Sequence, residues 1–130
     1  MKYEIQGTPL PVVTCTLEPD EKLVTARGVM CWMSDHMTMT TSTGGASRAI
    51  GRMFSGESIH VNTFSPKDTP GMIAFSSSFP GRILPVTIHP DKSMIVQKGG
   101  FLACQESVSL SVYFQKRLSL KISRIRPFPL

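Results

Sequence analysis

The sequence resembles itself when it is shifted by 71 positions. Residues 8–40 then align with residues 79–111 without a gap, and apolar positions mostly fall on apolar positions. Identical residues coincide at Pro9, Thr16, Pro19, Asp20 and Gly28, which match Pro80, Thr87, Pro90, Asp91 and Gly99. Self-similarity at a fixed spacing indicates a repeated structural unit. We therefore predict two internal repeats, 8–40 and 79–111, that fold alike.

Both copies have the residue alternation that is typical of β-strands. Val13, Cys15 and Leu17 alternate with threonines, and the same spacing of two recurs in the apolar series Val108, Leu110, Val112 and Phe114. This period places each apolar set on one face of a strand. Pro-Asp pairs follow in both copies and are typical of turns. The predicted fold class is all-β, a duplicated β-sandwich of short antiparallel strands with one short helical turn in the connector.

The segment between the copies contains two further strand candidates. IHVNTF (59–64) and GMIAFS (71–76) flank the turn sequence SPKDTPG, which predicts a β-hairpin with a longer loop. We expect a single β-sandwich domain over residues 1–118. Residues 119–130 are expected to form a basic C-terminal tail outside it.

The stretch GGASRAIGRMFSGES (44–58) allows two interpretations. Gly44 and Gly45 precede a short amphipathic helical turn, and Arg48 and Arg52 are four positions apart on one of its faces. Backbone N–H groups and two guanidinium groups would bind a small anion or a nucleotide. The alternative, which we favour, is a structural connector with solvated arginines, because the Lys-Ser/Thr pair of a phosphate-binding loop is missing.

Charge distribution argues against nucleic acid as the partner. The chain has 14 Lys+Arg and 9 Asp+Glu, a formal net charge of +5. Residues 1–115 are balanced, and the excess lies in the last fifteen residues, at Lys116, Arg117, Lys121, Arg124 and Arg126. A basic face over the body of the domain is therefore not expected.

Cysteine usage and hydropathy favour a cytoplasmic protein. Cys15, Cys31 and Cys104 are an odd number without a CxxC pair, as expected in a reducing compartment. The first residues lack the apolar core of a secretory signal, and no stretch approaches the ~20 apolar residues of a membrane span.

The sequence favours a protein without catalytic, metal or cofactor chemistry. The three histidines lack metal-ligand spacing, and the strand phase of Cys15 and Cys104 predicts buried, inert thiols. Asp35 and Glu106 correspond in the repeat, and matching turns explain them without an acid–base pair. The methionines near Trp32 leave two alternatives open, core filling or an adaptable apolar face at a subunit interface.

Six segments, in this order, resemble a known family. They are MKYEIQGTPLPV, VMCWMSDHMTM, RMFSGESIHVNTF, AFSSSFPGRILPV, IVQKGGFLA and VYFQKRL. Together they cover about residues 1–118 and are similar to the bacterial members of the altered inheritance of mitochondria (mitochondrial biogenesis) family. The resemblance implies a β-sandwich like that of the tryptophan RNA-binding attenuator protein, assembly into oligomers, and no catalytic residues.

The ending SLKISRIRPFPL departs from the family pattern, which continues with a third repeat. We interpret it as a truncated or frame-shifted form whose uncovered apolar surface is hidden by oligomerisation. The expected function is a non-catalytic homo-oligomeric interaction or scaffold module. The alternatives are RNA binding, by analogy of fold, and anion or nucleotide binding at Gly44, Gly45, Arg48 and Arg52.

Overall fold

The computed structural model describes residues 1–43, 60–97, 99–114 and 121–127, and in these ranges it contains eleven β-strands and no helix. This confirms the all-β prediction. The predicted helical turn lies in 44–59, outside the described residues. The strands are β1 (Lys2–Gln6), β2 (Val12–Leu17), β3 (Leu23–Ala26), β4 (Met30–Met33), β5 (Met37–Thr43), β6 (His60–Pro66), β7 (Gly71–Ser76), β8 (Met94–Gln97), β9 (Ala103–Gln105), β10 (Val108–Phe114) and β11 (Lys121–Pro127).

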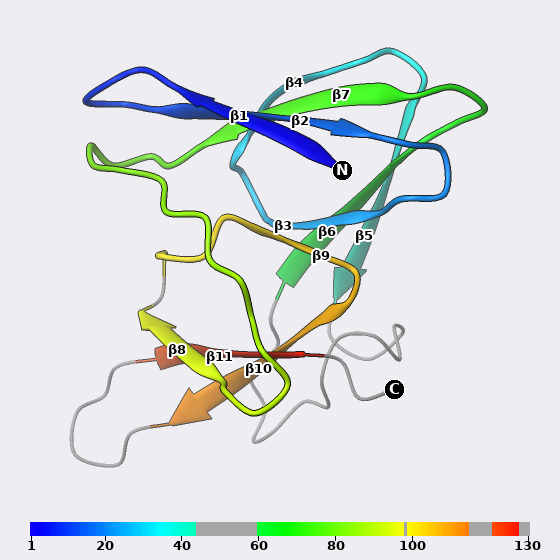
Figure 1. Cartoon of the computed structure of the whole chain (residues 1–130). Helices are drawn as coiled ribbons and strands as arrows, with labels where there is room; N and C mark the ends of the chain where they lie inside the picture. Colours follow the sequence, from blue (N-terminus) through cyan, green and yellow to red (C-terminus); the bar gives the residue numbers. More distant parts are fainter. Residues whose placement is uncertain (44–59, 98, 115–120, 128–130) are drawn as a thin grey trace.

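These strands form three antiparallel sheets that stack as layers (Figure 1). We name them by their place in that view. The upper sheet has the order β1-β2-β7-β4, the middle sheet β5-β6-β3-β9, and the lower sheet β10-β11-β8. The result is a sandwich with two apolar interfaces, one on each side of the middle sheet.

The upper interface follows from the predicted alternation in β2. Val13, Cys15 and Leu17 are buried, whereas the threonines between them are only half-buried. In register with them on β7 stand Phe75 and Ile73, which are also buried. Side chains of one strand face lie together across the sheet. This face therefore forms the upper core with residues of the middle sheet, namely Leu23, Met37 and Phe64.

Strand β3 is buried on both faces, which explains the three layers. Leu23 belongs to the upper core, and the next residue, Val24, belongs to a second core with Val61, Leu110 and Ile125. Successive side chains of a strand point to opposite faces. The middle sheet therefore packs on the upper sheet with one face and on the lower sheet with the other. Each fully buried apolar side chain of this kind contributes roughly 1.5–3 kcal/mol.

The predicted hairpin over 59–76 is wrong in its pairing, although both strands exist. β6 pairs with β5 and β3 in the middle sheet, and β7 pairs with β2 and β4 in the upper sheet. Phe64 and Ile73 both enter the upper core, from these two different sheets. The apolar faces of β6 and β7 are both buried when the two strands face each other across the core. The connection between them therefore crosses from one sheet to the other.

The connection from β6 to β7 is held by His36. The Lys67 N–H donates to the His36 carbonyl oxygen at 3.0 Å, and His36 Nε2 lies 3.0 Å from the Pro70 carbonyl oxygen. At Gly71, a Cβ atom would lie 2.5 Å from Met37 Sδ. A glycine at the start of β7 lets this connection pass close to β5.

Residues predicted as a tail form part of the lower sheet. We expected 119–130 to lie outside the domain, but Lys121–Pro127 forms β11, between β10 and β8. Ile125 is buried in the lower core. The basic composition of the segment concealed a strand whose place is set by pairing on both edges.

The strand bounds agree with the predicted repeat at two strands. A shift of 71 carries Leu23–Ala26 onto Met94–Gln97 and Met37–Thr43 onto Val108–Phe114, that is, β3 onto β8 and β5 onto β10. The same shift carries β2 onto residues 83–88, where the structure has no strand. The two copies therefore differ at this segment, and the repeat itself stays a prediction.

The contacts of His36 predict a pH-dependent contribution to stability. Hydrogen bonding to the Pro70 carbonyl and to Asp35 raises the pKa of His36 above its ordinary value. A raised folded-state pKa means that the contribution is fully present below the unfolded pKa and is lost as pH rises through the folded pKa. We expect His36→Gln to lower the melting temperature more at pH 5.5 than at pH 8.5. A melting-temperature difference that is equal at both pH values, or larger at pH 8.5, would contradict this role.

Candidate functional site

The Gly-rich connector cannot be placed in this fold. Gly44, Gly45, Arg48 and Arg52 all lie in 44–59, outside the described residues. Anion or nucleotide binding there stays a prediction that rests on the sequence alone.

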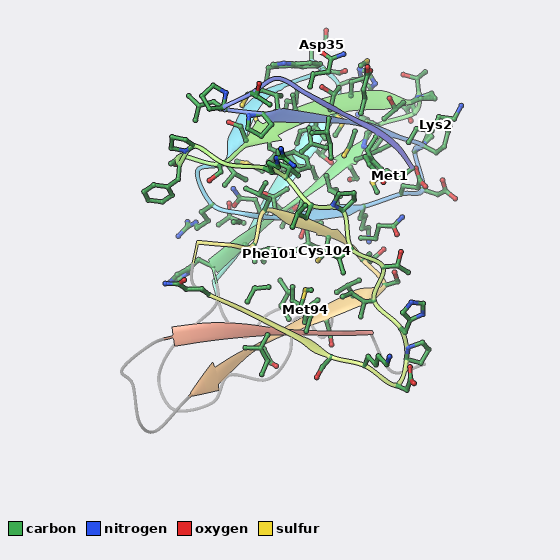
Figure 2. All side chains as sticks on the ribbon, turned by 60° about the vertical axis from the view of Figure 1, so that its left-hand side comes forward. Met1, Lys2, Asp35, Met94, Phe101 and Cys104 are labelled. Atoms are coloured by element: carbon green, nitrogen blue, oxygen red, sulfur yellow. The ribbon has the colours of Figure 1, made fainter. Side chains whose placement is uncertain are left out.

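Within the described residues, an apolar cleft of about 610 Å³ lies among the sheets. Its first wall is the upper sheet, with Tyr3, Ile5 and Phe75. A second wall is the segment 82–88, and the remaining walls come from 100–105, β8 and the buried lower core. Figure 2 shows Phe101 and Cys104 between the upper strands and Met94 of the lower sheet. The cleft therefore joins chain segments that are far apart in sequence.

The lining of the cleft is poor in charge. Among the described lining residues, Arg82 alone has a charged side chain, and none is His, Asp or Glu. Met1 also lines the cleft, and its N-terminal ammonium group forms an ion pair with Glu21. Such a surface favours binding of apolar groups, because it offers little with which to move a proton.

Two thiols face this cleft, and burial makes both weak acids. Desolvation raises the pKa of Cys15 to about 11 and the pKa of Cys104 to about 12. The thiolate is the reactive form, so both groups stay protonated and inert near neutral pH. All three cysteines are free, and Cys31 is the exposed one.

Segment 82–88 crosses the molecule between the two cores. It runs from the upper sheet down to the lower sheet (Figure 1). Ile83 packs against the upper core and Ile88 against the lower core. Between them Leu84 and Val86 are 76% and 50% exposed. The segment is therefore attached at both ends and presents apolar side chains to solvent in the middle.

The side chains of Asp35 and Glu106, which correspond in the predicted repeat, each contact a basic side chain. Asp35 contacts His36 at 3.3 Å, whereas Glu106 pairs with Lys22 at 3.3 Å, so each of the two carboxylates has its own basic neighbour. Among the described residues, no group of three or more His, Cys, Asp or Glu side chains is arranged to hold a metal ion. Along the same ranges, no helix has the length and apolar content that crossing a bilayer requires.

The methionines near Trp32 divide between the two interpretations. Met37 is buried in the upper core and Met33 is packed against it. Met30, Trp32 and Met39 are exposed. Core filling therefore explains the first pair, and an apolar surface explains the others.

Sequence reasoning missed the cleft and the exposed segment beside it. The shift of 71 predicts a strand at 83–88, and no local pattern shows that its pairing partners are absent. Pro85 is the one local signal, because proline lacks the N–H of a central strand. Nothing in the sequence pointed to a cavity built from segments so far apart.

Comparison with known proteins gives a family and a fold. The sequence model of the family described as mitochondrial biogenesis AIM24 matches residues 3–124. No protein of curated function matches the chain. The crystal structure of protein SPYM3_0169 from Streptococcus pyogenes is similar, with a TM-score of 0.78 and 21% sequence identity. The similarity covers 98% of this chain and 61% of that one, so this chain spans about three-fifths of that protein's length.

The surroundings of the three thiols predict their order of reaction. In the folded protein at pH 8, we expect DTNB to modify Cys31 rapidly, because it is exposed, and Cys15 and Cys104 only on unfolding. Absorbance at the start of the reaction should report one thiol per chain, and three after denaturation. Cys31→Ser should remove the fast phase. A fast phase that persists in this variant would show that a thiol beside the cleft is reactive.

Proposed function

The chain belongs to the mitochondrial biogenesis AIM24 family, and we propose that it is a non-catalytic interaction module that associates with copies of itself. Its sequence and its described residues suggest no reaction. The apolar, nearly uncharged lining of its cleft and the high pKa values of the thiols there support a role without catalysis. The free cysteines are consistent with a reducing compartment, and we propose the cytoplasm.

One observation carries the proposed self-association, the exposed apolar pair Trp32 and Met72 on the upper sheet. Trp32 stands opposite Ala74 in the β4–β7 pairing, so their side chains share one face, and Met72 follows on that face two residues away. Trp32 is 48% exposed and Met72 41% exposed, although Ala74 between them is fully buried. We call this pair the Trp32 patch.

The position of the Trp32 patch suits a contact between protein chains. Among the described residues, β4 is the last strand of the upper sheet, so the patch lies at an edge of that sheet. Tryptophan and methionine are enriched in interfaces, where they bury much area and adapt to the partner. The rest of this sheet face, over β1 and β2, is polar, with Lys2, Glu4 and Thr14. An apolar centre beside a polar surround is the usual anatomy of an interface.

Two alternative functions rest on the sequence alone. RNA binding follows from the attenuator-like fold, and anion or nucleotide binding from the connector. In the part of the chain that the structure describes, no residue adds support for either.

Self-association predicts a particle heavier than the 14.3 kDa chain in sedimentation equilibrium. We expect Trp32→Ala to raise the dissociation constant roughly thirtyfold, about 2 kcal/mol, as for an aromatic interface residue. Leu84→Ala is the matched control, because it truncates an exposed apolar side chain elsewhere and should leave the dissociation constant unchanged. A wild-type monomer at all concentrations, or equal effects of the two variants, would contradict the proposal.

A further inference from the structure

The cleft collects apolar side chains that the fold leaves exposed. Tyr3, Leu84, Val86 and Met94 are all exposed, and all line it. They come from β1, from the segment 82–88 and from β8, so separate parts of the chain present apolar surface to one space. Exposed apolar surface that is gathered in a concave site is typical of a ligand-binding groove.

The floor of the cleft belongs to the two cores. Tyr3 stands opposite Cys15 in the β1–β2 pairing, so both side chains lie on the inner face of the upper sheet. Cys15 is buried in the upper core, and Ile125, which also lines the cleft, is buried in the lower core. An apolar group that enters the cleft therefore leaves water for contact with both cores, which is favourable.

Arg82 is the single charged side chain in the described lining, and it is exposed. No hydrogen bond or ion pair joins its guanidinium group to another described residue. The ammonium group of Met1 is already paired with Glu21. No described lining residue carries a carboxylate that would repel an anion. Because an arginine binds a carboxylate through two parallel hydrogen bonds, the cleft combines an apolar wall with one site for an acid.

We propose that the cleft binds a free fatty acid of medium length, with its carboxylate on Arg82 and its alkyl chain along Leu84, Val86 and Met94. Taking roughly 30 Å³ for each non-hydrogen atom, the share of a water molecule in the liquid, an acid of about eight to twelve carbons needs roughly 300–420 Å³. The cleft of about 610 Å³ accommodates it. A lipid with two acyl chains has about 50 non-hydrogen atoms and needs roughly 1,500 Å³, which exceeds the cleft.

The course of the segment 82–88 orients the acid. Arg82 precedes Ile83, which packs against the upper core, and the segment ends at Ile88, which packs against the lower core. A carboxylate on the exposed Arg82 stays in contact with water, so it avoids the cost of burying a charge. The alkyl chain then covers the exposed apolar side chains that follow Arg82. An uncharged apolar molecule would leave Arg82 without a described partner.

Calorimetric titration of decanoate against the full chain tests the proposal, at concentrations below those at which decanoate forms micelles. We expect saturable binding of one molecule per chain. Affinity should rise roughly fourfold for each methylene group added between octanoate and dodecanoate, because each one buries further apolar surface. Trp32→Ala should bind decanoate as the wild type does, because Trp32 does not line the cleft. This separates the ligand site from the self-association proposed above.

Charge reversal at Arg82 tests the contact with the carboxylate. Arg82→Glu should weaken decanoate binding roughly tenfold, because it replaces an exposed attraction by a repulsion. Decanol has no carboxylate, so its binding should be unchanged. Arg27→Glu is the matched control, because Arg27 is exposed and lies outside the cleft, and it should alter decanoate affinity less than about twofold. Circular dichroism establishes that both variants are folded.

Isotope labelling of the methionine methyl groups locates the bound acid by NMR. Met94 lines the cleft, whereas Met72 is exposed on the upper sheet outside it. Decanoate should shift the methyl resonance of Met94 and leave that of Met72 in place. The variants Met94→Leu and Met72→Leu identify the two resonances.

Several outcomes would overturn the proposal. They are the lack of saturable decanoate binding, equal losses in Arg82→Glu and Arg27→Glu, and a shift of Met72 as large as that of Met94. Equal losses of decanol and decanoate in Arg82→Glu would show that no carboxylate contact exists. Binding to phosphatidylglycerol vesicles by a chain that does not bind free decanoate would assign the exposed apolar side chains to a membrane surface instead.

Discussion

The burial of β3 on both faces is the constraint on which the rest of the structure depends. Leu23 packs into the upper core and Val24 into the lower core, so one four-residue strand joins both apolar interfaces. Thr25, in the same strand, is fully buried, and its hydroxyl group donates to the Ala26 carbonyl oxygen at 2.9 Å. A buried hydroxyl group without such a bond would destabilise the layer. Because β3 must be covered twice, the sheets stack in three layers.

Stacking the sheets in this way leaves two kinds of exposed surface, which differ in what they offer a partner. The Trp32 patch presents apolar side chains on the outer face of the upper sheet, beside its edge strand β4, which pairs with β7. Segment 82–88 presents the exposed side chains of Leu84 and Val86 between Ile83 and Ile88, which pack against the two cores.

Sequence reasoning reached the strands and failed at their pairing. Alternation located β2 and β10 because a period of two is a local property of the chain, and the turn sequence SPKDTPG located β6 and β7 on its two sides. The pairing of β6 with β7 was wrong, since a turn sequence such as SPKDTPG does not reveal whether the chain stays in one sheet or crosses to the next. The absence of a strand at 83–88 was invisible for the same reason, because pairing depends on partners distant in sequence. The cleft was missed because it exists only once distant segments meet.

Native-state hydrogen exchange tests the central claim, that β3 holds the two cores together, most directly. The Val24 and Thr25 amides should exchange only through global unfolding, with an opening free energy equal to that of the whole chain, roughly 5–15 kcal/mol. Amides of the edge strand β4 should open locally at lower cost. If β3 exchanged as fast as β4, or if the lower sheet unfolded while β3 lost no protection, the middle sheet would not be the shared layer of this fold.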